Sequence, residues 1–353
     1  MLALTTTSIA WVIFVVILVG WLVYAFLNFR QARDELGSEI ELAPNRKPYY
    51  DDEELEGPRL TRMLGFSFAM LAVIAIGLPL YWIFEPSRMA GAEAQKEEQF
   101  IEWGASLFAP TAEGGFNCAG CHGGMNATGG SAEFNLPDPA TGGVELVNWL
   151  APALNTIYYR FDEEEVRFII VYGRPFSPMS PWGVEGGGPM NDQQVDTLLA
   201  YLWSIQIPRE DCGPGEDDPL SCPTGHLPTA IQEEIDAAAD KAVADGLYAT
   251  RGEALYNLST ASGAYSCARC HTPGWSWGDP GEPGQGAFGW NLTGGSTNEH
   301  FPNEADMIEF ITSGSTYGAR YGTQGQGSGR MPGFGAMLTE DQIREIAEYV
   351  RSL

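Results

Sequence analysis

Two long apolar runs stand near the start of the chain, at residues 9–27 and 63–84, and neither contains a charged side chain. As helices rising 1.5 Å per residue, each would be about 30 Å long, which matches the hydrocarbon core of a bilayer. The alternatives are a cleaved signal peptide for the first run and a buried core helix for the second. Residues 1–8 lack the basic segment that a signal peptide needs. The pattern predicts two N-terminal transmembrane helices.

Basic residues predict the orientation of this anchor, residues 1–90. The loop at 28–62 carries six Lys and Arg side chains, whereas residues 1–8 carry none. Because short cytoplasmic loops are enriched in Lys and Arg, the loop is expected on the cytoplasmic side. We therefore expect a multi-pass protein of a bacterial plasma membrane, with everything from about residue 90 onward on the extracytoplasmic, periplasmic side.

Charge narrows the possible partners. The net charge of -27 excludes a nucleic-acid binder, because such a protein needs clustered Lys and Arg against phosphate. From residue 97 onward there are 35 acidic and 11 basic side chains. This excess is either a docking surface for a basic partner or ordinary solubilising charge. Both interpretations stay open.

The region after residue 97 contains an internal repeat with an offset near 150 residues. A duplicated domain of about 110 residues explains it, since this is the size of a small independent fold. The paired segments are 102–108 and 250–256, 118–122 and 267–271, Asn135-Leu136 and Asn291-Leu292, the acidic amphipathic stretches 161–172 and 301–312, and the closing helices 192–204 and 340–352.

Each repeat contains one Cys-x-x-Cys-His motif, the attachment motif of c-type haem. Two thiols one helical turn apart add to the porphyrin vinyl groups, and the histidine binds the iron. A zinc ribbon needs its two Cys pairs about 15 to 20 residues apart, whereas these pairs lie 149 apart. The motifs predict two covalently attached haem c groups. Their ligands would be the thioether cysteines Cys118, Cys121, Cys267 and Cys270 and the axial histidines His122 and His271.

A low-spin electron-transfer haem also needs a distal ligand, for which methionine sulfur is suited. In the second repeat the candidates are Met307, Met331 and Met337. Met337 precedes a capping box, Thr339-x-x-Gln342, and is expected to pack at the helix start. Met331 lies in a glycine-rich irregular segment and is the predicted ligand.

The first repeat has a matching choice between two methionines. Met190 precedes a similar cap and is expected to pack, whereas Met179 lies between two Ser-Pro segments. Met179 is the predicted ligand. The sequence separations from the first cysteine of each motif agree: Met179 follows Cys118 by 61 residues, and Met331 follows Cys267 by 64.

On these residues, each repeat resembles a class I cytochrome c domain, over about 97–208 and 246–353. The resemblance rests on a first helix with a glycine and an aromatic residue, the haem motif, a Met loop and a last helix with an aromatic residue. The shared residues are Gly104, Phe108 and Tyr201 in the first copy and Gly252, Tyr256 and Tyr349 in the second. The family implies an all-α fold in which the terminal helices cross through these residues. The expected architecture is two transmembrane helices followed by two tandem cytochrome c domains, at 91–208 and 246–353.

The linker at 209–245 contains the two remaining cysteines. Cys212 and Cys222 enclose a turn-rich loop, and an extracytoplasmic location favours a disulfide between them. A metal site shared with His226 is the alternative. Residues 229–245 are expected to form a helix with Ile231, Ile235 and Val243 on one face.

Three further side chains have no assigned ligand role. His300 is expected near the surface or a haem propionate, although it could replace Met331. Arg174 and Arg330 lie close to the proposed Met ligands, where they would either donate to propionates or remain solvated.

No catalytic acid, base or nucleophile is evident, so the chain is expected to transfer electrons within a larger oxidoreductase without a catalytic site of its own. It resembles the dihaem cytochrome cc subunit of bc-type quinol:cytochrome c reductases, including those in supercomplexes with an oxidase. That resemblance implies cytochrome b, a Rieske protein and a haem-copper oxidase as partners. The alternative is the dihaem electron-entry subunit of a cbb-type haem-copper oxidase. A dihaem peroxidase would need an open distal site, against which the two methionines argue.

Overall fold

A computed structural model describes residues 14–27, 57–138, 141–174, 177–259, 266–315 and 331–353. The chain forms two compact units, Met1–Arg88 and Met89–Leu353. The second unit contains both Cys-x-x-Cys-His motifs, and the finer division at residues 91–208, 209–245 and 246–353 stays a prediction.

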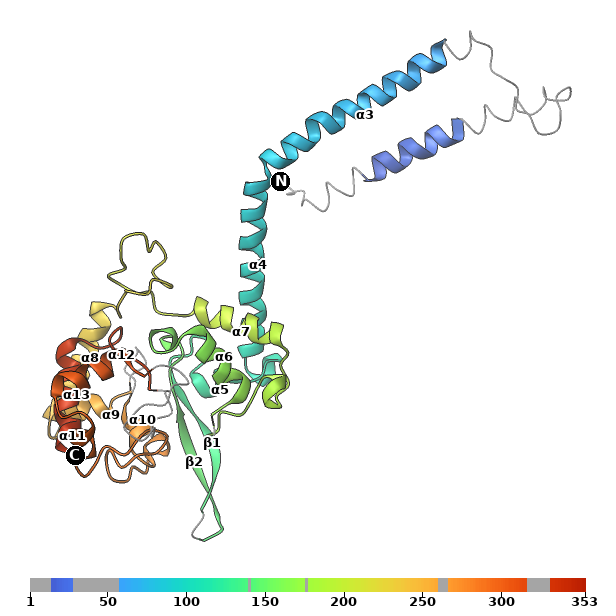
Figure 1. Cartoon of the computed structure of the whole chain (residues 1–353). Helices are drawn as coiled ribbons and strands as arrows, with labels where there is room; N and C mark the ends of the chain where they lie inside the picture. The colour runs from blue at the N-terminus through green and yellow to red at the C-terminus, as the bar shows by residue number, and fades with distance from the viewer. Residues whose placement is uncertain (1–13, 28–56, 139–140, 175–176, 260–265, 316–330) are drawn as a thin grey trace. The chain divides into compact units, whose positions relative to one another are not determined.

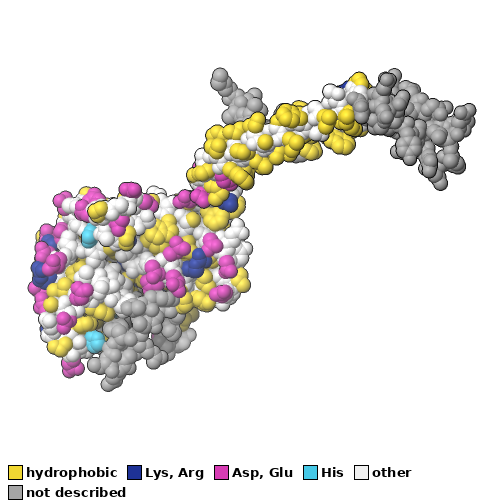
Figure 2. Space-filling model, turned by 45° about the horizontal axis from the view of Figure 1, so that its top comes forward, with side chains coloured by type: hydrophobic (Ala, Val, Ile, Leu, Met, Phe, Trp, Pro, Cys, Tyr) yellow, Lys and Arg dark blue, Asp and Glu magenta, His cyan; other side chains and the backbone are white. Residues whose placement is uncertain are grey.

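One helix of the first unit is long and apolar enough to cross a membrane in the part of the chain that is described. This helix, α3 (Pro58–Ile83), begins after Gly57 with a proline in its first turn, where the missing N–H is not needed. None of its side chains is buried in the structure, and Figure 2 shows its surface as mostly hydrophobic. Helix α3 corresponds to the second run at 63–84.

The prediction of two N-terminal transmembrane helices is wrong for the described residues. The apolar run at 9–27 is described only from Phe14, and its helix, Phe14–Leu27, is too short to count as a membrane span. A 14-residue helix rises about 21 Å, whereas the hydrocarbon core is about 30 Å thick. Residues 9–13 of this run lie outside the described residues. Most of the loop at 28–62 lies outside the described residues.

The second unit begins with the elements of the first repeat (Figure 1). Its α-helices are α4 (Glu85–Phe108, which starts in the first unit), α5 (Cys118–His122), α6 (Glu163–Tyr172) and α7 (Asp192–Ser204). The two strands are β1 (Gly130–Pro137) and β2 (Val144–Ala151), and the short 3-10 turns are Thr111–Glu113, Ile157–Tyr159 and Val184–Gly186.

The linker helix and the second repeat follow. Helix α8 (Thr229–Ala244) leads into α9 (Arg251–Asn257), α10 (Ala268–His271), the 3-10 turn Trp275–Trp277, α11 (Ser296–His300), α12 (Glu304–Ser313) and α13 (Glu340–Ser352). The acidic stretches of the two repeats become helices of equal length, α6 and α12, and each ends at a glycine with positive φ.

The first and last helices of each repeat cross where the sequence predicted. A Cβ on Gly104 of α4 would lie 1.9 Å from the carbonyl oxygen of Thr197 on α7, and a Cβ on Gly252 of α9 would lie 2.0 Å from that of Glu345 on α13. An aromatic pair flanks each crossing, with ring centroids 5.2 Å apart in the first repeat and 5.3 Å apart in the second. Only glycine permits backbones this close.

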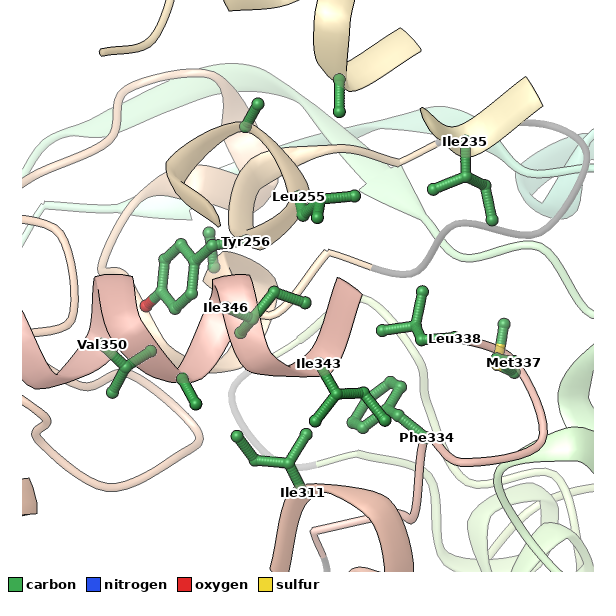
Figure 3. Packing of buried hydrophobic residues seen from close by; sticks show 14 of the residues in the cluster. Ile235, Leu255, Tyr256, Ile311, Phe334, Met337, Leu338, Ile343, Ile346 and Val350 are labelled. Atoms are coloured by element: carbon green, nitrogen blue, oxygen red, sulfur yellow. The ribbon is translucent and has the colours of Figure 1, made fainter. Parts of the chain in front are cut away.

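Two hydrophobic cores lie on these crossings. The first joins α4, α6 and α7 through side chains such as Phe108, Val166 and Leu198. The second joins α8, α9, α12 and α13 (Figure 3). Its labelled side chains are Ile235, Leu255, Tyr256, Ile311, Phe334, Met337, Leu338, Ile343, Ile346 and Val350.

The all-α prediction is wrong, because β1 and β2 form an antiparallel hairpin inserted in the first repeat. Figure 1 shows it projecting from the helical part. Alternate residues of β1 are partly buried and exposed, the period of a strand with one packed face. Asn135-Leu136 lies within β1, so its pairing with Asn291-Leu292 does not hold in the structure.

The linker between the repeats is fastened at several points. Cys212 and Cys222 form a disulfide, and the backbones of Glu210 and His226 bridge next to it. On α8, Ile235 is buried, and Ile231 and Val243 pack against the second core. The predicted apolar face of this helix is confirmed.

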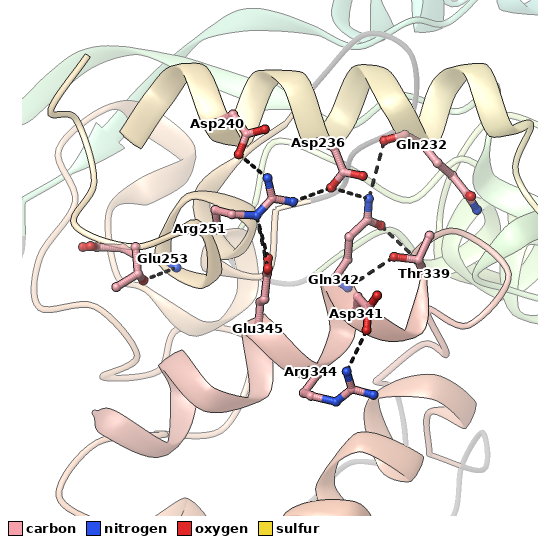
Figure 4. Close-up of polar contacts among 11 residues, drawn as sticks. Gln232, Asp236, Asp240, Arg251, Glu253, Thr339, Asp341, Gln342, Arg344 and Glu345 are labelled. Atoms are coloured by element: carbon pink, nitrogen blue, oxygen red, sulfur yellow. Dashed lines mark hydrogen bonds and ion pairs between the residues drawn. The ribbon is translucent and has the colours of Figure 1, made fainter. Parts of the chain in front are cut away.

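Arg251 ties three helices of the second repeat together (Figure 4). It donates to Asp236 at 2.7 Å and to Asp240, both on α8, and to Glu345 of α13 at 3.0 Å. Gln342, in the capping box that opens α13, donates to Asp236 at 3.1 Å. The network positions the linker helix against the second domain.

Replacing Gly104 by Ala is expected to lower the free energy of unfolding by about 1–3 kcal/mol, because the new Cβ overlaps the backbone of α7. Gly91 is a matched control in the same helix, where an added methyl group would meet nothing within 4 Å. Gly91→Ala should raise stability by about 0.5–1 kcal/mol. Denaturant unfolding of the full chain in detergent, followed by tryptophan fluorescence, measures both. Equal stability of the two variants would contradict the close crossing.

Arg251→Gln is expected to destabilise the second domain by about 1–2 kcal/mol, since it leaves three partly exposed carboxylates without their shared cation. Among the described residues, Arg344 forms ion pairs with Glu340 and Asp341 on its own helix surface, so Arg344→Gln should leave the unfolding curve unchanged. The same denaturant titration compares them. A neutral Arg251→Gln would show that the network does not hold α8.

Candidate functional site

The first motif forms a single helical turn, α5, that fixes the orientation of His122. The ring Nδ1 lies 2.8 Å from the carbonyl oxygen of Pro152. A carbonyl only accepts, so Nδ1 carries the proton and Nε2 is left to bind a metal. Burial lowers the pKa of His122, which favours the neutral ring that metals require.

The second motif repeats this arrangement. His271 Nδ1 donates to the carbonyl oxygen of Trp290 at 2.8 Å, and burial likewise lowers its pKa. A Cβ on Gly289 would lie 2.6 Å from the His271 ring, so a glycine is needed where the backbone passes the imidazole. The residues that correspond in the two repeats are therefore Pro152 and Trp290, and the hairpin is inserted between α5 and Pro152.

The four motif cysteines are partly buried, free thiols. Burial raises the pKa of Cys118 to about 11 and that of Cys267 to about 12. A raised pKa disfavours the thiolate that zinc binds, so the burial of Cys118 and Cys267 argues against a zinc site at these two positions.

A cavity of about 340 Å³ opens beside the first motif. It brings together four side chains that the sequence predicted for one site: Cys118, Cys121, His122 and Met179. The rest of its wall is mostly aromatic and aliphatic, including Phe108, Phe116, Phe161, Ile170, Trp182 and Leu198. The cavity therefore offers thiols, an imidazole and a thioether sulfur within an apolar enclosure.

The loop after α6 holds Met179 at this wall. The Met179 N–H donates to Ser177 Oγ at 3.2 Å, and the Met179 carbonyl accepts from the Arg174 N–H at 2.8 Å. A Cβ on Gly173, whose φ is +69°, would lie 2.5 Å from that carbonyl oxygen. Glycine is thus required for the loop to return past the helix end.

Met331 occupies the corresponding place after α12. Its carbonyl accepts from the Ser315 N–H at 2.9 Å, and its own N–H donates to Ser315 Oγ at 2.9 Å. Gly314 has a φ of +73°, and a Cβ there would lie 2.7 Å from the Met331 carbonyl oxygen. The two predicted Met ligands therefore share one local geometry. Arg330 lies outside the described residues.

The other methionines considered from the sequence are core residues. Met190 and Met337 are 0% and 1% exposed, and Met307 is buried on α12. Met337 also accepts a contact from Arg160 Nη1 of the first repeat, at 3.4 Å from its sulfur. The two unassigned histidines lie elsewhere: His226 is exposed in the linker, and His300 packs edge-on against Phe301.

Three guanidinium groups line the first cavity, from Arg160, Arg174 and Arg269. Arg160 is buried and donates to Thr156 Oγ1 and to the Ala153 carbonyl. The described lining residues include no Asp or Glu, although the chain has 46 acidic and 19 basic residues. A wall with three guanidinium groups is suited to an anionic occupant.

Part of that wall comes from the second repeat. Arg269, Cys270, Ser276 and Phe288 line the cavity together with the first-repeat residues. Nearby, Trp149 of β2 and Trp277 pack with ring centroids 4.8 Å apart. The first site is therefore completed by the second domain.

Sequence reasoning missed Arg160 and Arg269 as site residues. One feature of the sequence could have indicated Arg269: it is a charged residue inside the second motif, at the position where the first motif has Gly120. Arg160 has no such feature, because its burial depends on how the two repeats pack.

The residues present fit haem c. The apolar cavity would enclose the ring, Cys118 and Cys121 would attach it, His122 and Met179 would bind the iron, and the three guanidiniums would suit the propionates. The second repeat has two corresponding cysteines, a corresponding histidine and a Met loop of the same local geometry.

Comparison with known proteins supports part of this assignment. Residues 248–350 match the family described as Cytochrome C oxidase, cbb3-type, subunit III. No curated protein and no solved structure matches the chain. The match covers the second repeat, from before α9 to near the end of α13. The chain therefore contains a c-type cytochrome domain at 248–350, which binds haem c covalently and serves electron transfer.

Proposed function

We propose that this protein is a membrane-anchored dihaem cytochrome c that carries electrons from a quinol-oxidising bc-type complex towards a terminal oxidase. One observation carries the proposal: both repeats hold the motif histidine on a backbone carbonyl and the Met loop on a positive-φ glycine. A duplicated ligand geometry is expected if each domain binds the same cofactor.

Bound haem would supply one-electron transfer at its iron. The chain supplies the rest. His122 and Met179 would bind the iron, Cys118 and Cys121 would anchor the ring, and the apolar wall would exclude water. A Met ligand and a dry site both favour a relatively high reduction potential.

A location at the bacterial plasma membrane is part of the proposal. Helix α3 exposes an apolar surface of bilayer length. The disulfide between Cys212 and Cys222 suits an oxidising compartment, so the cytochrome domains are proposed to face the extracytoplasmic, periplasmic side. Acidic side chains spread over the face of the second unit in Figure 2 and are available to a basic redox partner.

The family match favours a second candidate, an electron-entry subunit of a cbb-type haem-copper oxidase. The two candidates differ in partners: cytochrome b and a Rieske protein for the first, a haem-copper subunit alone for the second. Mass spectrometry of proteins that copurify in mild detergent separates them. Cytochrome b with the Rieske protein would support the first candidate, and a haem-copper subunit without either would overturn it.

Met331→Ala is expected to lower the potential of the second haem by about 0.1 V or more, because the axial ligand is a main determinant of haem potential. The far-red sulfur-to-iron band of that haem should be lost, and a high-spin spectrum should replace it. Met337→Leu is the matched control in the same loop region and should leave potential and spectrum unchanged. The opposite result, with Met337→Leu changing both, would show that Met337 is the ligand.

A further inference from the structure

One charged side chain of the second domain reaches into the first site. Arg269 lies in α10 between the two cysteines of the second motif and is only 7% exposed. Its Nη1 donates to the carbonyl oxygen of Leu150 on β2, in the first repeat. Its guanidinium also lies 5.0 Å from the ring centroid of Trp275. The side chain is thus held on both sides.

The cavity contacts define what this cation faces. Arg269 and its neighbour Cys270 line the same cavity as Cys121, His122 and Met179. The other charged groups of the described lining are Arg160 and Arg174, both cationic. A fixed positive charge at a wall of low polarity stabilises whichever state of the occupant is more negative.

We propose that the charge of Arg269, a residue of the second domain, raises the reduction potential of the first haem. The inference rests on the proposed function, since it requires haem in the first domain. Reduction adds one electron, so the cation favours the reduced form. At an effective dielectric constant near 20, one fixed charge close to the site changes the reduction equilibrium about tenfold.

The two motifs differ at this position. The first motif has Gly120 at the position of Arg269, so it offers no cation to the second site. The second domain therefore biases the first haem towards the reduced state, which makes that haem a better electron acceptor than its own ligands alone would make it.

The test is a redox titration of the full-length holoprotein in detergent, followed by its visible spectrum. The double variant Cys118→Ser/Cys121→Ser cannot attach the first haem, so the wave that remains in its titration belongs to the second haem. Arg269→Gln should then lower the first potential by about 59 mV, the one-electron equivalent of a tenfold change. The far-red Met band should stay, because no ligand is altered.

Two variants separate charge from structure. Arg269→Lys keeps the cation and should restore most of the first potential, whereas Arg344→Gln removes an exposed charge of α13 and should change neither wave. Arg269→Gly places in the second motif the residue that the first motif has there, and it serves as a second variant if Arg269→Gln binds too little haem. It should give the same shift in the first potential as Arg269→Gln.

An unchanged first potential in Arg269→Gln or Arg269→Gly would overturn the inference, as would failure of Arg269→Lys to restore a lowered one. A haem absorbance equal to one haem per wild-type chain would instead contradict the two-haem proposal itself. The two failures are therefore distinguishable.

Discussion

Each cytochrome-like repeat depends on one backbone contact, the crossing of its first and last helices at a glycine. With Gly104 on Thr197 and Gly252 on Glu345, no side chain separates the helices. The crossing fixes both ends of the domain, so the segments between them must form the cavity wall. The Cys-x-x-Cys-His turn follows the first helix, and the Met loop precedes the last. In the first repeat, the motif residues and Met179 lie far apart in the sequence but line one cavity.

The second constraint is electrostatic. A strongly acidic chain has placed three of its few arginines at the first cavity, where the described lining has no carboxylate. Arg160 and Arg269 both make contacts between the repeats, to the Met337 sulfur and to the Leu150 carbonyl oxygen. If haem c binds here as we propose, its anionic propionates would be matched by cations that both repeats hold.

The chemistry of the site was more predictable than its surroundings. Motif cysteines, histidines and Met loops follow from local spacing and from the repeat, so Met179 and Met331 could be chosen over Met190 and Met337. The hairpin at β1 and β2 was missed although its alternating pattern is present, because the family resemblance implied helices only. Arg160 and Arg269 were missed for another reason. Their role depends on contacts between the repeats, which no local pattern encodes.

The anchor shows a similar limit. Two apolar runs of bilayer length predicted two spanning helices, but only α3 reaches that length in the described chain. At α3 the glycine and proline at its start set that end beyond the apolar run.

The central claim is that both repeats bind haem. The most direct measurement is the intact mass of the mature protein, taken together with its haem absorbance per chain. Two covalently attached haems per chain are predicted, and Cys118→Ser/Cys121→Ser should leave one. A single haem in the wild-type chain, or no loss in the double variant, would contradict the account.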